Sequence, residues 1–142
     1  IVGTGIDPGR IELEITESMA LTETDTVVET LRRMKRFGVS IAVDDFGSGF
    51  SSLGHLQRLP LDRLKIDRAF VADLSPGSSG STIAETIVKL GHLLGLTVIA
   101  EGVETREQLD TLRQMGCQEV QGFYFSPPVP ADAFPALLKK TL

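Results

Sequence analysis

The sequence of 142 residues holds a single cysteine, Cys117. One cysteine excludes an internal disulfide framework and is typical of a protein in a reducing cytoplasm. No apolar run approaches the roughly 20 residues that a membrane-spanning helix needs. Positive charge is also scarce, because the 14 lysine and arginine residues are outnumbered by 19 acidic residues, which gives a formal net charge of −5. A chain with this charge and no basic stripe is not expected to bind duplex nucleic acid.

The chain begins at Ile1 rather than at methionine, and no charged and then apolar leader follows. These features predict that the sequence is a piece of a longer protein. A composition with 42% hydrophobic and 23% charged residues is typical of one soluble globular domain. We therefore expect residues 1–142 to belong to one cytoplasmic domain, and any membrane anchor to lie in an N-terminal region outside this sequence.

Short β-rich runs alternate with amphipathic helical stretches along the chain. Strands are predicted over residues 11–15, 39–45, 63–67, 96–100 and 119–123. Helices are predicted over residues 24–37, 51–59, 82–94, 105–115 and 131–140, with a flexible loop over residues 75–81. Thr105 with Gln108 three residues later indicates a capping box. Five strands alternating with helices predict an α/β fold with a parallel sheet and right-handed crossovers.

Two folds fit this alternation, a doubly wound sheet and a (β/α)₈ TIM-type barrel. The dinucleotide-binding fingerprint is absent, because residues 47–52 lack its third glycine. A polar residue recurs at the carboxyl end of each strand, at Glu14, Asp44, Lys65, Glu101 and Gln121. These positions converge on one mouth in a barrel, whereas an open sheet would spread them along a line. The pattern favours a barrel truncated at its N-terminus, of which this chain supplies the C-terminal part, about five of eight βα units.

Two adjacent carboxylates, Asp44 and Asp45, end an apolar run just before a glycine-serine loop. Such a pair repels itself and costs desolvation near a core, and a divalent metal is the commonest compensation. Any one of the acids at strand ends alone fits an N-cap or a solvated loop residue. The four together, Glu14, Asp44, Asp45 and Glu101, favour a metal centre of Mg²⁺ or Mn²⁺ rather than zinc. Two such metals would clamp the attacking and leaving oxygens of a phosphodiester.

Lys65 lies between Leu64 and Ile66, so its side chain is expected to point away from the apolar face and toward the acids. A surface lysine fits this position as well as a lysine that bonds carboxylates, orients a water molecule or offsets phosphate charge. Gln121 fits a residue that satisfies a buried backbone group, and Glu17 fits a cap of the following segment.

Five short motifs occur in order along the chain. They are Glu14-Ile15-Thr16-Glu17-Ser18, Asp44-Asp45-Phe46-Gly47-Ser48-Gly49-Phe50-Ser51-Ser52-Leu53, Lys65-Ile66-Asp67, Glu101-Gly102-Val103-Glu104 and Gln121-Gly122-Phe123. This series closely resembles the EAL-domain cyclic-di-GMP phosphodiesterases, and the resemblance covers essentially the whole chain. It implies a modified (β/α)₈ barrel with two metal ions, Mg²⁺ or Mn²⁺. It also implies hydrolysis of cyclic di-GMP to the linear dinucleotide pGpG in bacterial signal transduction.

The resemblance also implies a role for each motif residue. Glu14 and Asp44 would hold one metal, Asp44 would bridge to the second, and Asp45 would be a further ligand of the second. Glu101 matches the metal-linked glutamate assigned as general base, and Lys65 matches the lysine that contacts the hydrolytic water. The remaining residues would position the substrate or the loop. Gln121 would line the site, Glu104 would lie near the mouth, and Glu17 would anchor the flexible loop of Gly47, Ser48 and Gly49.

Two parts of the family pattern are missing from this sequence. The family's opening Glu-x-Leu strand and a later strand with an asparagine ligand would precede Ile1, so three barrel strands and two metal ligands are absent. Every other motif is intact, which favours truncation over degeneration. We expect the chain alone to expose barrel edges and apolar surface, to be poorly stable or self-associated, and to be inactive. For the full-length protein we expect a homodimer with upstream sensory or diguanylate-cyclase-like domains.

Two functions of different classes compete. The first is metal-dependent hydrolysis of cyclic di-GMP by the complete domain, and the second is a catalytically inactive receptor module that binds cyclic di-GMP. Retention of Asp44, Asp45, Lys65 and Glu101 favours the enzyme, because a receptor need not keep metal ligands or a base. A third and remote reading is an unrelated barrel hydrolase that acts on another phosphoester.

Overall fold

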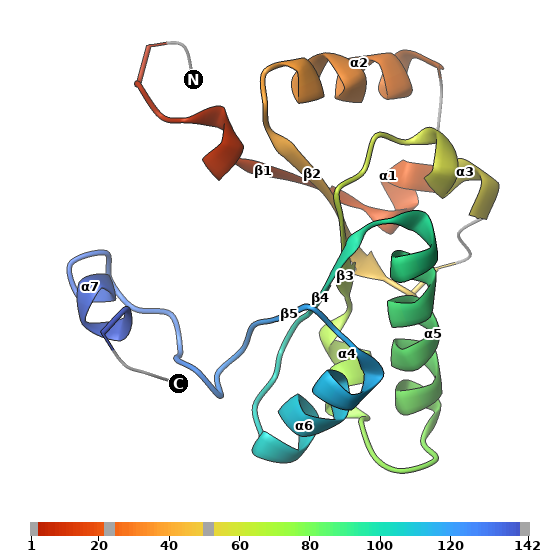
Figure 1. The fold of residues 1–142 in the computed structure, drawn as a ribbon, viewed down its shortest axis with the longest axis vertical. Coiled ribbons are helices and arrows are strands. Elements are labelled where there is room, and N and C mark those ends of the chain that lie inside the picture. Colours follow the sequence, from red (N-terminus) through yellow and green to blue (C-terminus); the bar gives the residue numbers. More distant parts are fainter. Residues whose placement is uncertain (1–2, 22–24, 50–52, 140–142) are drawn as a thin grey trace.

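The computed structural model describes residues 3–21, 25–49 and 53–139. Its strands form one parallel sheet in which the spatial order equals the chain order (Figure 1). The strands are β1 (Glu12–Thr16), β2 (Ser40–Phe46), β3 (Arg63–Ile66), β4 (Thr97–Ala100) and β5 (Glu119–Val120). A doubly wound sheet reverses its strand order part-way, whereas a (β/α)₈ barrel adds each strand beside the previous one. The observed order is that of a barrel.

Helices connect the strands. They are α1 (Glu17–Leu21), α2 (Asp25–Arg36), α3 (Leu53–Arg58), α4 (Arg68–Ala72), α5 (Ser79–Leu94), α6 (Arg106–Met115) and α7 (Phe134–Leu137), with a 3₁₀ turn η1 (Pro8–Arg10) before β1. Figure 1 shows α2, α3 and α5 on one side of the sheet, and α7 apart from them on the other side. The sheet is therefore covered by helices on one face.

The two faces of the sheet differ in chemistry because strand residues alternate between them. The residues toward the helices are apolar and buried, and they form the core with α2, α5 and α6; among them are Ile15, Ile41, Val43, Leu64, Ile66, Val98 and Ala100. The alternate positions carry charged side chains, including Glu14 on β1 and Lys65 on β3. The functional site therefore lies on the face that the helices leave open.

The predicted strands are confirmed, with ends that differ by at most three residues. The largest difference is β5, which ends at Val120, because the chain turns away after Gln121. The capping box of α6 is confirmed, since Thr105 Oγ1 accepts from Gln108 N and Gln108 Oε1 accepts from Thr105 N. The predicted helix starts at residues 24 and 51, and the predicted end at residue 140, lie outside the described residues.

Two predicted boundaries are wrong. The loop expected over residues 75–81 is shorter, because Ser78 caps α5 by accepting a hydrogen bond from Ser81 N, so the helix begins at Ser79. The last helix was expected over residues 131–140, but α7 begins only at Phe134, after a chain segment rich in proline. The helices α1 and α4 are too short, at five residues each, to show a periodic pattern in the sequence.

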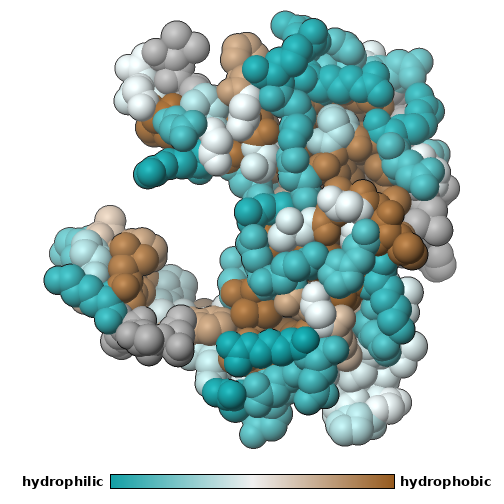
Figure 2. Space-filling view, in the orientation of Figure 1, coloured by the Kyte–Doolittle hydropathy of each residue, from teal (hydrophilic) through white to brown (hydrophobic). Residues whose placement is uncertain are grey.

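The surface shows large apolar side chains and unpaired strand edges. Leu93 on α5 is 86% exposed and Leu138 is 73% exposed. Figure 2 shows the molecule hollowed on the side between its N-terminal segment and α7. Within the described residues, β1 pairs only with β2, and β5 pairs only with β4. These features agree with the expected exposure of apolar surface and barrel edges, while low stability and self-association stay predictions.

Among the described residues, no helix combines the length and the apolar character that are needed to pass through a bilayer.

Cys117 packs against the core beside β4, and its thiol donates to the carbonyl oxygen of Glu119 at 3.2 Å. Burial raises the pKa of the thiol to about 11, although hydrogen bonds to the backbone partly oppose this. We expect iodoacetamide at pH 8 to alkylate Cys117 about a hundredfold more slowly than free cysteine, because the thiolate is the reactive form. Mass spectrometry would measure the rate, with the urea-unfolded chain as control. Equal rates for the folded and the unfolded chain would contradict the prediction.

Candidate active site

One ammonium group gathers three carboxylates at the carboxyl end of the sheet. Lys65 Nζ lies 2.6 Å from Glu14 Oε1, 2.7 Å from Glu101 Oε1 and 3.0 Å from Asp44 Oδ1. The acids come from β1, β2 and the residue after β4, and Lys65 stands between them on β3. The predicted convergence of polar strand ends on one mouth is therefore confirmed for these four residues.

The orientation of Lys65 follows from its neighbours. Leu64 and Ile66 are fully buried under the helices, so strand alternation turns Lys65 to the open face of the sheet. Its side chain is nevertheless only 7% exposed, because the three carboxylates surround it. The alternative of a surface lysine is therefore wrong.

The protonation state of Lys65 is set by two opposing effects. Burial disfavours the charged amine, but the hydrogen bonds to Glu101 and Glu14 and the contact with Asp44 outweigh it and raise the pKa of Lys65. A lysine with a raised pKa stays protonated at neutral pH and cannot accept a proton. Lys65 can therefore donate to a water molecule or to a phosphate oxygen, but it cannot serve as a general base.

Glu101 is held from two sides. Gln121 Nε2 donates to Glu101 Oε1 at 2.7 Å, and Lys65 contacts the same oxygen. Gln121 is itself fixed by its backbone, whose nitrogen donates to Ala100 O and whose oxygen accepts from Val103 N. The Glu101 carboxylate thus has a defined orientation toward the mouth, which is what a general base requires.

A β-bulge explains how two adjacent acids avoid the core. The residue before Asp44 lies opposite Leu64 and the residue after Asp45 lies opposite Ile66, so both aspartates stand opposite Lys65 alone. Asp45 adopts a φ of 53°, the left-handed conformation that is uncommon for residues other than glycine. A regular strand would turn one of the two carboxylates under the helices. The bulge instead leaves Asp45 exposed.

The loop after β2 is tied to a buried glutamate. Glu17, which is 3% exposed, accepts hydrogen bonds at Oε2 from Gly47 N at 3.0 Å and from Gly49 N at 2.9 Å. Ser48 Oγ donates to the carbonyl oxygen of Asp45 at 2.8 Å, which closes the loop on the bulge. The position of Glu17 is therefore the one that an anchor of this loop requires. The rest of the loop motif, residues 50–52, lies outside the described residues.

An open cavity of about 560 Å³ adjoins Glu101 and Gln121. Glu104 is exposed and lines this cavity rather than the cluster around Lys65. Arg68 at the start of α4 also lines it, together with apolar residues that include Phe123, Val129 and Phe134. Nothing in the local sequence distinguishes Arg68, because a lone arginine after a strand is usually a surface residue.

The oxygen atoms of the mouth fit a hard divalent cation, although they are not arranged as a finished metal cage. Across residues 3–21, 25–49 and 53–139, no three histidine, cysteine or acidic side chains stand in a geometry that would hold a metal. However, Asp44 Oδ1 is buried without a hydrogen-bond partner among these residues, and its contact with Lys65 is an ion pair only. A buried carboxylate oxygen without a hydrogen bond, among other carboxylates, is a fitting ligand for Mg²⁺ or Mn²⁺.

The family model of the EAL domain matches residues 1–128 of the chain. The chain belongs to the EAL domain family. This membership confirms the resemblance that the five motifs indicate. It also accounts for a parallel sheet whose spatial order equals the chain order.

Among EAL proteins, the cyclic di-GMP phosphodiesterase NbdA of Pseudomonas aeruginosa is 44% identical over 129 residues, which are 91% of this chain and 16% of NbdA. The structure of the PaMucR phosphodiesterase with cyclic di-GMP matches with a TM-score of 0.89 at 41% identity, over 94% of this chain and 54% of that chain. Klebsiella pneumoniae BlrP1 with manganese and cyclic di-GMP matches with a TM-score of 0.80 at 35% identity, over 89% and 32%. This chain therefore spans about half of the PaMucR chain and about a sixth of NbdA.

Proposed function

We propose that this chain carries the catalytic mouth of a metal-dependent phosphodiesterase that hydrolyses cyclic di-GMP to linear pGpG in the complete EAL domain. In this proposal, residues 1–142 are the C-terminal portion of one such barrel. The observation that carries it is the convergence of Glu14, Asp44 and Glu101 on Lys65. The likeness to NbdA and to PaMucR, whose names give this activity, supports the substrate.

The metals of this reaction would be held by Glu14, Asp44, Asp45 and Glu101. When bound, Mg²⁺ or Mn²⁺ would act as a Lewis acid and stabilise charge on the phosphoryl oxygens. The manganese in BlrP1, a family member, supports this choice of cofactor. Asp44 Oδ1, which is buried and whose contact with Lys65 is an ion pair, supports the ligand set from within this chain.

Each remaining side chain acts on protons, charge or position. Glu101, oriented by Gln121, takes the proton of the attacking water as general base. Lys65 donates to the water or to the phosphate and offsets negative charge as the phosphorus is attacked. Glu17 keeps the loop of Gly47, Ser48 and Gly49 in place beside the bulge. The cavity lined by Arg68 and Glu104 accommodates the body of the dinucleotide.

The substrate is thus a small molecule. A cytoplasmic location, a homodimer and additional upstream domains remain part of the proposal for the full-length protein. The receptor alternative shares the fold and the ligand, so only the chemical step separates the two functions.

The substitution Glu101→Gln in the full-length protein tests the proposal. We expect it to lower hydrolysis by about 10²–10⁴-fold, because the amide cannot accept the proton of the attacking water. Chromatography of pGpG formed with Mg²⁺ would measure the rate. The matched control is Glu107→Gln, which changes an exposed glutamate on α6.

Equal rates for Glu101→Gln and the wild type would remove Glu101 from the mechanism. A wild-type protein that binds cyclic di-GMP without cleaving it would support the receptor alternative instead. A wild type that neither binds nor cleaves it would overturn both functions.

A further inference from the structure

A second charged layer lies beneath the cluster around Lys65. Arg63 is on β3, two residues before Lys65, and therefore faces the same side of the sheet. Its Nε lies 3.1 Å from Glu12 Oε2 and its Nη1 lies 2.8 Å from Glu119 Oε2. One guanidinium thus joins two carboxylates from strands that are not its neighbours.

The strands that supply this layer are β1, β3 and β5, with β2 and β4 between them. In a (β/α)₈ barrel, side chains from alternate strands share one interior layer, and these layers are usually filled with branched apolar residues. Here the layer consists of Glu12, Arg63 and Glu119 instead. In this structure the three side chains are 26–45% exposed. Inside a complete barrel they would be costly to desolvate, so their presence there calls for a specific role.

The two acids of this layer lie on the strands that carry site residues. Glu12 precedes Glu14 by two residues on β1, and Glu119 precedes Gln121 by two residues at β5. The strand β5 pairs with β4 at only two positions, so the ladder alone holds it weakly. The tie from Arg63 to Glu119 therefore helps to place Gln121, which in turn bonds Glu101.

We propose that Arg63 is a positioning residue for hydrolysis, which acts by fixing β1 and β5 and so the placement of Glu14 and Gln121. The inference rests on the proposed function for its kinetic consequence. A second effect is electrostatic: without Arg63, Glu12 would lose its ion pair, and Lys65 would be the cation left to act on it. The ammonium would then be drawn away from Glu101 and Asp44.

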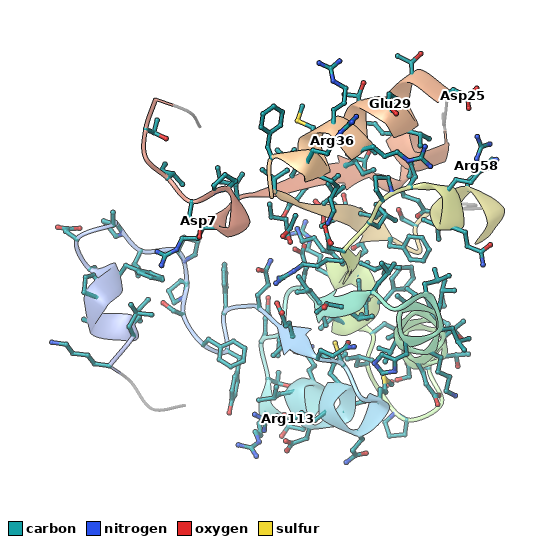
Figure 3. All side chains as sticks on the ribbon, turned by 45° about the horizontal axis from the view of Figure 1, so that its top comes forward. Asp7, Asp25, Glu29, Arg36, Arg58 and Arg113 are labelled. Carbon is teal, nitrogen blue, oxygen red and sulfur yellow. The ribbon has the colours of Figure 1, made fainter. Side chains whose placement is uncertain are left out.

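The kinetic test compares Arg63→Met and Arg63→Lys in the full-length protein. We expect Arg63→Met to lower kcat by about ten- to hundredfold with KM changed less than about twofold, because small misplacements of catalytic groups are costly. Arg63→Lys keeps the charge but loses the fork, so its kcat is expected to lie between those of Arg63→Met and the wild type. The control is Arg36→Met, which breaks an exposed ion pair with Glu29 on α2 (Figure 3).

The number of folded sites is counted by calorimetric titration with cyclic di-GMP in Ca²⁺. Each kcat is then calculated per site that binds cyclic di-GMP. This normalisation separates an effect on positioning from a loss of folded protein. If Arg63→Met lowers activity only in proportion to the number of sites, the proposal is overturned. The same holds if its kcat equals that of Arg36→Met.

A structural test does not depend on activity. We expect a crystal structure of Arg63→Met to show the Gln121 Nε2 to Glu101 Oε1 distance or the Lys65 Nζ to Glu14 Oε1 distance lengthened beyond about 3.5 Å, where a hydrogen bond is lost. Both distances unchanged from the wild type would overturn the role of Arg63. A wild type that does not hydrolyse cyclic di-GMP would refute the proposed function, while these distances would still decide the role of Arg63.

Discussion

Replacing Lys65 with methionine in the full-length protein is expected to lower cyclic di-GMP hydrolysis by about 10²–10³-fold, the usual cost of removing one preorganised donor from a reaction site. Methionine keeps the length of the side chain but carries no charge. Glu14, Asp44 and Glu101 would then face one another without the ammonium that joins them. Initial rates at saturating Mg²⁺ would measure the effect. Lys89→Met is the matched control, because Lys89 forms an exposed ion pair with Glu85 on α5.

The same substitution is expected to lower the free energy of unfolding by about 2 kcal/mol. This value is below the 3–5 kcal/mol of a fully buried pair, because Glu14 is 47% exposed and water screens part of the repulsion. The pKa of Lys65 is raised in the folded state, so its stabilisation is fully present below the unfolded pKa of about 10.4 and is lost as pH rises through the folded pKa. The contribution of Lys65 to the difference in the free energy of unfolding between variant and wild type should therefore be the same at pH 7 and at pH 9. Urea unfolding at both pH values would measure it.

A Lys65→Met protein with wild-type rates would show that Lys65 only neutralises the acids and takes no part in hydrolysis. A difference in stability that disappears between pH 7 and pH 9 would contradict the raised pKa.

Replacing Gly122 with alanine is expected to lower the free energy of unfolding by about 3 kcal/mol, at the upper end of the range for overpacked positions. A Cβ at this position would overlap the backbone nitrogen and carbonyl oxygen of Val103 and lie 2.8 Å from its carbonyl carbon. These backbone atoms cannot move easily, because Val103 N donates to Gln121 O and Val103 O accepts from Tyr124 N. In the complete domain the melting temperature should fall by roughly 6–12 °C.

Activity should fall together with stability in Gly122→Ala. The neighbouring Gln121 would shift with the backbone and lose its hydrogen bond to Glu101. The control is Gly77→Ala, where no atom lies within 4 Å of the added Cβ and only a φ of 80° opposes the change. That control should cost about 1–2 kcal/mol and leave hydrolysis intact. Equal effects of the two substitutions would show that the contact with Val103 relaxes.

Much of the site could be predicted from the sequence because it follows from strand ends. An apolar run fixes where a strand lies, and parallel strands bring their carboxyl ends to one edge. The positions of Glu14, Asp44, Lys65 and Glu101 follow from this rule alone. The loop anchor at Glu17 needed the family resemblance, since a buried glutamate in a short helix gives no periodic signal.

The remaining features depend on contacts between distant parts of the chain. The bulge at Asp44 and Asp45 is a matter of register against β3, and nothing in the local sequence shows which residue is left unpaired. In the sequence Arg63 is an ordinary polar strand residue, and only the fold brings Glu12 and Glu119 beside it. The shortness of α7 reflects the proline-rich segment before it more than the apolar pattern of residues 131–140.

The identity of spatial and chain order in the sheet also bears on how the protein is made. Each of β2 to β5 pairs with the strand synthesised just before it, and β1 can pair with β2 once Phe46 has left the ribosome. Synthesis at about 5–20 residues per second leaves time for each unit to dock before the next one emerges. Lys65 can therefore meet Glu14 and Asp44 before Glu101 and Gln121 are synthesised. Nascent chains halted at successive lengths should gain protease resistance one strand at a time.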